Sequence, residues 1–332
     1  MHTLNETESH RESTRMQIVD PTDYVPAHSR ITMLLVVTVP FLGLLAGILL
    51  FWGRGFSWIQ LGLFLGMYLL TALGVTLGYH RLFAHQSFET IWPVKLTLGI
   101  LGSMAFEGPL FKWVAMHRMH HHHSDSRYDP HSPHASGGGF LPTIRGFWHA
   151  HVGWMFAADP PGLVRYTHDL LADPLLRAVS KLFLLWAILG LLIPAALGGV
   201  LTGTWIGALM GFIWGGLARL FFVHHMTFSI NSVCHIWGRR PFRTRDQSRN
   251  NLVFGVLGMG EGWHNNHHAF PASARHGLKW WQMDATYLVI RALKAVRLVW
   301  KVRLPRADTM AGKRYGTQPL LQDHSVLALH DG

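Results

Sequence analysis

Four long apolar stretches constrain the fold of this chain more than any other feature. They cover about residues 31–52, 56–78, 178–197 and 204–224, and each is close to the roughly 20 residues that cross a bilayer as a helix. Because lipid offers no hydrogen-bonding partner to the backbone, helices are the expected form of these stretches. The sequence therefore predicts an integral, multi-pass, all-α membrane protein with four transmembrane helices.

Short connections join these stretches into two hairpins. The segment Gly53–Gly55 follows the first stretch and Gly198–Gly203 follows the third, and neither is long enough to hold a domain. The first contains one arginine and the second contains no basic residue, whereas the basic runs lie outside the hairpins. Since Lys and Arg concentrate on the cytoplasmic side, both termini and the two connecting regions are expected to be cytoplasmic.

The expected domain organisation follows from this topology. A polar cytoplasmic tail covers residues 1–28, a membrane domain covers 29–305, and a flexible cytoplasmic tail covers 306–332. Within the membrane domain, the connecting regions 79–177 and 225–305 form a helical cytoplasmic cap. The net charge of +11 is spread along membrane-proximal segments, which disfavours nucleic-acid binding and favours contact with the lipid bilayer.

Two clusters of histidine have the same internal spacing. The stretch "HRMHHHH" contains His117, His120 and His121, which fall on one face of a helix at about 100° per residue, and "HNNHH" repeats these offsets. The complete set of candidate ligands, taken with the histidines that follow the second and fourth apolar stretches, is His80, His85, His117, His120, His121, His235, His264, His267 and His268.

These nine histidines exceed the four ligands of a structural zinc site, so they predict two metal ions. A single histidine is more often a hydrogen-bonded core residue, but a repeated three-histidine pattern favours metal binding. Imidazole binds Fe, Zn, Cu and Ni, and spacing alone does not select among them. The only cysteine, Cys234, excludes a thiolate-rich site. Asp125, Asp129 and Glu261 are the candidate carboxylates that can orient the imidazoles, although a salt bridge or a helix cap is an equally good interpretation of each one alone.

The motifs "GYHRLFAHQSF", "HRMHHHHSD", "DPHSPH", "HAHVGW", "NSVCH" and "EGWHNNHHAFP" resemble the histidine boxes of membrane fatty-acid desaturases of the stearoyl-CoA type, over roughly residues 30–300. The resemblance implies that the nine histidines hold two iron ions and that Asn231 contributes through a water. It implies an O2-dependent reaction that places a cis double bond in a long-chain acyl substrate. Trp113 matches a residue of the family's substrate tunnel, although an ordinary core tryptophan is the alternative.

The resemblance favours acyl-CoA as the substrate. Ala115 and Met116, however, stand where the animal enzymes carry an Arg-Asp pair associated with the CoA head group, so acyl-lipid and acyl-carrier substrates stay open. No haem-binding "HPGG" motif is present and the segment after Pro305 is short. A separate electron donor is therefore expected, which is a ferredoxin, a cytochrome or a flavin reductase.

Two other functions compete with desaturation. Membrane hydroxylases share similar histidine boxes, and their spacing does not separate insertion of oxygen from removal of hydrogen. A histidine-rich metal transporter is disfavoured, because such proteins carry ionisable residues within their spans. The first two apolar stretches have no charged residue or histidine in their interiors.

Overall fold

The computed structural model describes residues 26–51, 57–135, 137 and 139–315. Four helical segments in this part are long and apolar enough to cross a membrane, namely Ala27–Leu49, Trp58–Ala84, Phe183–Thr202 and Trp205–Ile236. The predicted all-α membrane fold with four such helices is confirmed, except that two short strands form a minimal antiparallel sheet. The expected turn at Gly53–Gly55 lies within 52–56, outside the described residues.

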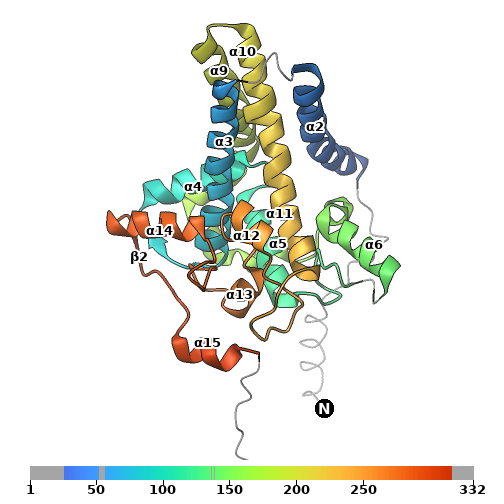
Figure 1. The fold of residues 1–332 in the computed structure, drawn as a ribbon, viewed down its shortest axis with the longest axis vertical. Coiled ribbons are helices and arrows are strands. Elements are labelled where there is room, and N and C mark those ends of the chain that lie inside the picture. Colours follow the sequence, from blue (N-terminus) through green and yellow to red (C-terminus); the bar gives the residue numbers. More distant parts are fainter. Residues whose placement is uncertain (1–25, 52–56, 136, 138, 316–332) are drawn as a thin grey trace, which may run out of the picture.

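Two of the four spans contain π-helical turns. The first span is α2 (Ala27–Phe51), and the second is α3 (Trp58–Leu73) continued by the π-helix η1 (Gly74–Ala84). The third is α9 (Phe183–Thr202). The fourth joins three consecutive segments, which are α10 (Trp205–Gly211), the π-helix η4 (Phe212–Ala218) and α11 (Arg219–Ile236). Figure 1 shows α3, α9, α10 and α11 rising together, with α2 beside them.

All four spans differ in their bounds from the apolar stretches of the sequence. The second and third run past their predicted ends to Ala84 and Thr202, so most of the turn predicted at Gly198–Gly203 is helical. The third span begins at Phe183 rather than near Ala178, because the preceding residues form a separate helix, α8 (Pro174–Lys181), capped by Asp173. The fourth runs beyond residue 224 to Ile236. Apolar composition marks only the first part of this helix, and its continuation carries Asn231 and His235 on buried or partly buried turns.

Local sequence signals account for where the spans begin. Ser57 and Gln60 form a capping box at the start of α3, which satisfies backbone N–H groups that have no partner within the helix. At the second hairpin, Gly203 adopts a positive φ of 66°, and the Thr204 hydroxyl accepts a hydrogen bond from the backbone N–H of Gly207 at 3.0 Å. Glycine and threonine at these positions therefore produce a tight turn between α9 and α10.

Small residues allow close contact between the third and fourth spans. A Cβ atom on Gly211 would lie 2.1 Å from the carbonyl oxygen of Pro194, and one on Gly198 would lie 2.2 Å from that of Gly207. Helices in membranes gain association energy from such close packing, since lipid tails are as apolar as the side chains. The second hairpin is therefore held by backbone-to-backbone proximity.

Shorter elements gather at one end of the spanning helices (Figure 1). The elements are β1 (Glu89–Thr90), α4 (Trp92–Met104), α5 (Leu110–His123), α6 (Phe140–His151), η2 (Gly153–Phe156), η3 (Leu163–Tyr166), α7 (His168–Leu171), α8, α12 (Leu252–Leu257), α13 (His264–Ala269), α14 (Ala285–Ala295), β2 (Val299–Trp300) and α15 (Ala307–Lys313). Their largest hydrophobic core includes Leu77 of η1, Val114 of α5, Val179 of α8 and Ile290 of α14. This core fixes the end of the second span against the helix that carries "HRMHHHH".

Part of the expected flexible C-terminal tail is structured. Residues 307–313 form α15, and Met310 packs against the cluster of Phe242, Ala269 and Phe270. The Lys313 ammonium donates to the carbonyl oxygen of Ala269 at 2.6 Å. This part of the predicted tail is therefore helical and contacts the cap, while the flexibility of the tail stays a prediction. Residues 316–332 and 1–25 lie outside the described part of the chain.

Candidate metal centre

All nine predicted histidines lie in two adjacent groups. The five-histidine group contains His80, His85, His117, His121 and His267, and the four-histidine group contains His120, His235, His264 and His268. In each group the potential ligand atoms lie within 4.8 Å of one another. The rings of His121 and His268 stack with centroids 4.4 Å apart, so the two groups share a boundary.

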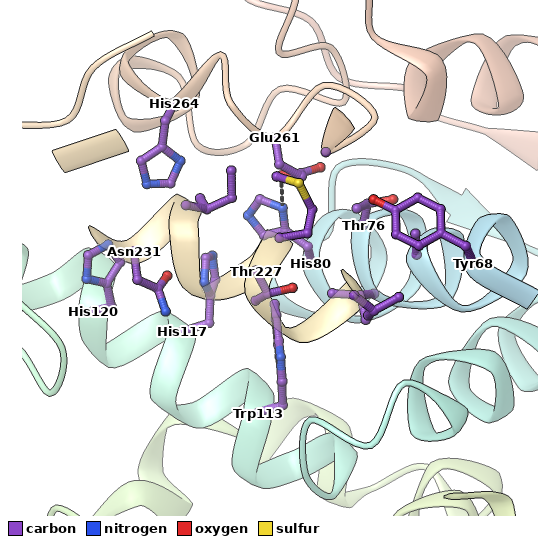
Figure 2. A pocket seen from close by; sticks show the side chains of 16 residues that line it. Tyr68, Thr76, His80, Trp113, His117, His120, Thr227, Asn231, Glu261 and His264 are labelled. Carbon is purple, nitrogen blue, oxygen red and sulfur yellow. Dashed lines mark ion pairs between the residues drawn. The ribbon is translucent and has the colours of Figure 1, made fainter. Parts of the chain in front are cut away.

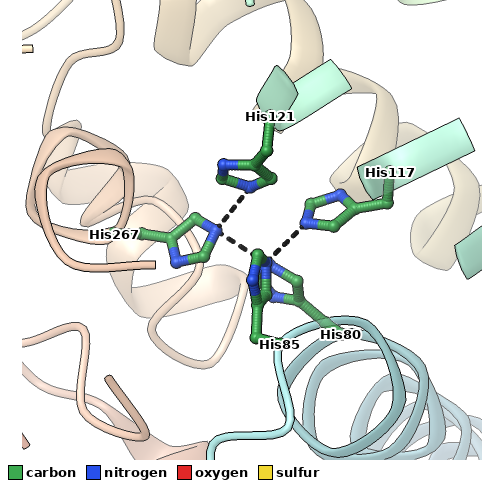
Figure 3. Close-up of side chains that lie close together, drawn as sticks. All are labelled: His80, His85, His117, His121 and His267. Atoms are coloured by element: carbon green, nitrogen blue, oxygen red, sulfur yellow. Dashed lines mark hydrogen bonds between the residues drawn. The ribbon is translucent and has the colours of Figure 1, made fainter. Parts of the chain in front are cut away.

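Helix geometry explains how α5 serves both groups. His117 and His121 are one turn apart and point into the five-histidine group, as Figure 3 shows, while His120 belongs to the other group. His122 is exposed, and its ring and that of His123 lie against each other with centroids 4.5 Å apart. Among the described residues, neither belongs to a potential metal-binding group. The run of histidines is thus divided as the helical periodicity predicts.

The π-helix η1 brings His80 and His85 together. On an α-helix, residues five apart would point about 140° away from each other. Here the backbone N–H of His85 donates to the carbonyl oxygen of His80 at 3.0 Å, which is the bonding pattern of a π-turn. Their ring centroids are consequently only 4.8 Å apart, and both enter the five-histidine group (Figure 3).

The inward-facing nitrogens of the rings are Nε2 atoms. In the five-histidine group, Nε2 of His267 lies 3.0 Å from that of His80 and 2.9 Å from that of His121. In the four-histidine group, Nε2 of His264 lies 3.1 Å from that of His235 and 3.0 Å from that of His268. So many converging imidazole nitrogens cannot all find donors in one another. They form a donor set suited to cations.

Burial keeps five of these rings in the neutral form. Burial, followed by the neighbouring imidazoles, holds the pKa values of His85, His117, His121, His264 and His267 well below the ordinary value for histidine. Neutral rings present lone pairs, as metal ligands must. The buried Nε2 atom of His120 has no hydrogen-bond partner within the described structure, which also fits a ligand atom directed at an ion.

Four carboxylates fix the orientation of four rings through Nδ1. Glu261 accepts from His80 at 2.6 Å, and three aspartates accept from the four-histidine group. These pairs are Asp129 with His120 at 2.9 Å, Asp125 with His235 at 2.9 Å, and Asp246 with His268 at 2.8 Å. Because a carboxylate only accepts, each Nδ1 carries the proton and each Nε2 is left free for a metal.

The carboxylates are ionised despite their burial. Burial alone would raise the pKa of Asp129, but the charge and hydrogen bond of His120 lower it to about 2. Opposing effects of the same kind hold the pKa values of Asp125 and Asp246 below the ordinary range, with His235 and His268 as the partners. Burial would also raise the pKa of Glu261, but the nearby His80, His276 and Arg81 outweigh this effect and hold the pKa well below its ordinary value.

Sequence reasoning found three of these carboxylates and missed the fourth. Asp125, Asp129 and Glu261 were expected near the histidines, whereas Asp246 is 22 residues from His268 in sequence. No spacing pattern marks it, because a loop returns it to α13. Also missed were His276, whose Nδ1 lies 3.4 Å from Glu261, and the fully buried Arg81.

An apolar pocket adjoins both histidine groups. Its polar and ligand-bearing side includes His80, His117, His120, Glu261 and His264, and its other walls come from Ala72, Val75, Val223, Met226 and Ile230. Figure 2 shows Tyr68 on the opposite side of this pocket from His120 and His264. The pocket therefore leads from between the spans α3 and α11 to the metal-binding groups.

Trp113 and Asn231 both line this pocket. The Trp113 ring stacks on His117, with centroids 5.2 Å apart, and its indole N–H donates to Glu107 at 3.0 Å. Thr227, across the pocket wall on α11, donates to the other oxygen of Glu107 at 2.7 Å. Asn231 lies one helical turn from His235 on α11, near His120 in Figure 2.

Comparison with known proteins agrees with this geometry. Residues 56–302 match the family described as fatty acid desaturase. The chain belongs to the fatty acid desaturase family. It is 42% identical over 294 residues to the hex-5-enoyl-[acyl-carrier protein] acetylenase of Moorena producens, which covers 88% of this chain and 92% of that protein.

Other desaturase relatives differ in the substrate that their names give. This chain is 38% identical over 271 residues to the sn-1 stearoyl-lipid 9-desaturase of Anabaena variabilis, covering 80% and 93% of the two chains. It is 39% identical over 240 residues to the icosanoyl-CoA 5-desaturase of Limnanthes douglasii, covering 70% and 62%. The predicted family is confirmed. The names of these relatives give acyl-carrier, acyl-lipid and acyl-CoA substrates, so they do not establish the stearoyl-CoA type for this chain.

Proposed function

We propose that this chain is an O2-dependent di-iron desaturase that places a cis double bond in a long-chain fatty acyl substrate. The observation that carries the proposal is the pair of histidine groups, whose Nε2 atoms converge beside an apolar pocket. Two bound irons would supply the redox chemistry that activates O2, which zinc cannot do. Overall, O2, two electrons and two protons from solution take two hydrogens from the chain, giving a double bond and two waters.

The protein residues would position both the metals and the acyl chain. Asp125, Asp129, Asp246 and Glu261 hold the Nδ1 protons and so keep the ligand rings oriented. The apolar walls of the pocket exclude water and align the chain's methylene groups past the histidines. We assign Asn231 a ligand role through a water, and Trp113 a place in the pocket wall next to the reacting carbons.

For the head group, we propose a membrane glycerolipid, with acyl-CoA and acyl-carrier protein as alternatives. The positions that carry an Arg-Asp pair in the animal acyl-CoA enzymes are Ala115 and Met116 here, and both side chains are buried. They offer no charge to a phosphate-rich CoA group. The sn-1 stearoyl-lipid 9-desaturase of Anabaena variabilis, 38% identical to this chain, supports the lipid-linked substrate.

We further propose that the histidine-bearing end and both termini face the cytoplasm, where a separate protein donates the electrons. The distribution of Lys and Arg along the sequence supports this orientation. A ferredoxin, a cytochrome and a flavin reductase are all chemically able to supply one electron at a time.

The test is expression of the full chain with a working reductase system in a host that lacks this activity, followed by mass spectrometry of the fatty acids. A new monounsaturated chain, recovered mainly in glycerolipids, is the expected result. Purified protein should then be offered a saturated chain as lipid, CoA and carrier-protein forms to rank the head groups. A hydroxylated product would instead identify a membrane hydroxylase, and an unchanged profile with iron-loaded protein would contradict desaturation.

A further inference from the structure

The carboxylates behind the two histidine groups are distributed unequally. In the four-histidine group, three of the four rings each donate Nδ1 to an aspartate of their own, at 2.8–2.9 Å. In the five-histidine group, only His80 does so, to Glu261. For the other four rings of that group, no carboxylate oxygen of the described residues lies within 4.0 Å; these rings belong to His85, His117, His121 and His267.

The charge of Glu261 is also compensated by a cation, whereas the three aspartates have no Lys or Arg partner among the described residues. The buried Arg81 guanidinium lies 3.0 Å from Glu261 and 3.0 Å from Asp284. The two carboxylates and the guanidinium together carry one net negative charge. Asp284 contacts Arg81 rather than a ligand histidine. The five-histidine group therefore has little anionic charge directly against its rings.

Backbone groups, not cations, hold the three aspartates. Asp125 accepts from the N–H of Gln247 at 2.7 Å, Asp129 from that of Asp125 at 2.8 Å, and Asp246 from that of Ser248 at 2.9 Å. Within the described part of the chain, their ion-pair partners are imidazoles only. Three full negative charges thus stand one imidazole ring away from the four-histidine group.

This asymmetry has a direct electrostatic consequence. A carboxylate that accepts from Nδ1 makes the imidazole a stronger donor at Nε2, and nearby negative charge favours the more positively charged form of an ion. Both effects act three times at the four-histidine group and once at the five-histidine group. The fifth imidazole of the latter adds a neutral donor and no charge.

We propose that the two iron sites are unequal, and that the three aspartates stabilise the ferric state at the four-histidine group relative to the five-histidine group. The proposal rests on the proposed di-iron function. On this proposal, the first electron given to the fully ferric protein would reduce the iron held by the five-histidine group. The second electron would reduce the iron held by His120, His235, His264 and His268.

Stepwise reduction of the full chain, purified in detergent and loaded with ⁵⁷Fe, tests this order. Dithionite is added in small portions, and Mössbauer spectra give the ferric and ferrous fractions, while EPR detects the half-reduced form. Two identical independent sites would give at most about one half of the molecules in the half-reduced form. For the wild-type chain we expect a maximum clearly above that value.

Two charge-removing variants make the test directional. Each of the variants Asp246→Asn and Glu261→Gln removes one negative charge. Each retains a side-chain oxygen, now of an amide, that can accept the hydrogen bond from Nδ1. Asp246→Asn should lower the maximal half-reduced fraction, because the sites become more alike. Glu261→Gln should raise it. Iron content and thermal unfolding are measured to identify a variant that has lost the metal site. For such a variant, the reductive titration of the wild type alone tests whether the two sites are unequal.

The inference would be overturned if the maximal half-reduced fraction of the wild type were at or below about one half. It would also be overturned if this fraction shifted in the same direction in both variants. Fatty-acid products are measured on the same preparation. An active enzyme whose two sites are reduced together would reject only the inequality. Protein that takes up no iron and forms no product would reject the proposed function as well.

Discussion

Asp129 places both of its carboxylate oxygens within 3.0 Å of Nδ1 of His120, at 2.9 and 3.0 Å. The carboxylate is itself fixed by the backbone N–H groups of Asp125 and His131. Since Nδ1 carries the proton, Nε2 of His120 is turned toward the four-histidine group, where it has no partner among the described residues. The ring is thus prepared as a ligand by the protein itself.

Replacing His120 with Ala should abolish desaturation and lower the iron content of the purified protein. Loss of an orienting group alone typically reduces metal affinity or activity about 10- to 100-fold, and loss of a ligand should reduce them further. Metal analysis and product profiling of the variant measure both effects.

The double variant His122→Ala with His123→Ala is the matched control on the same helix. These two residues lie outside both histidine groups, so iron content and most of the activity should be retained. Equal loss of iron in both variants would mean that the whole run binds metal without division.

Glu107 should make the stability of the protein depend on pH. Burial raises the pKa of Glu107 to about 7, although hydrogen bonds from Thr227 and Trp113 oppose the rise. Between the unfolded-state pKa of 4.5 and about 7, the folded protein holds a proton that the unfolded chain has lost. This contribution to stability is fully present below that window and is lost as the pH rises through it.

Thermal unfolding of the detergent-solubilised wild type and of Glu107→Gln, from about pH 5 to about pH 8, measures this contribution. The amide has no carboxyl proton to lose, so its melting temperature relative to that of the wild type should rise with pH. Parallel curves for the two proteins would show that Glu107 stays ionised throughout.

Gly74 should not tolerate a methyl group. A Cβ atom there would lie 2.2 Å from the backbone nitrogen of Gly102 on α4, so Gly74→Ala should destabilise the protein by about 1–3 kcal/mol through overpacking. Gly66→Ala on the same span is the control, because a Cβ there meets nothing within 4 Å. A fall in melting temperature confined to the first variant is the expected result, and equal melting temperatures would contradict the close contact.

Cysteine labelling in intact cells should define the orientation. The only native cysteine, Cys234, is fully buried and should react little. Trp205→Cys, at an exposed position of the second hairpin turn, should react with an impermeant thiol reagent from outside. Thr309→Cys, exposed on α15, should react only after the membrane is opened. The reverse pattern would invert the proposed topology.

The spans were predictable from the length of the apolar stretches, and six of the nine histidines from a helical spacing that occurs twice. His80, His85 and His235 have no such periodicity and were found from their place after the second and fourth apolar stretches and from the resemblance. The offsets of His117, His120 and His121 fix a helical face, and the repeat at His264 marks its counterpart. The approach of Asp246 to His268 could not be predicted, since it depends on how the loop after α11 folds back. The same holds for Arg81, whose charge became interpretable only when Glu261 and Asp284 were seen beside it.

The π-helical winding of η1 determines where its histidine rings lie, but it has no effect on how apolar the segment is. Ordinary α-helical winding of the same residues would leave the segment just as apolar, and therefore about as able to enter a bilayer. It would, however, set the rings of His80 and His85 about 140° apart around the helix axis, whereas their centroids are 4.8 Å apart here. The five-histidine group therefore depends on a feature of backbone winding that hydrophobicity does not report.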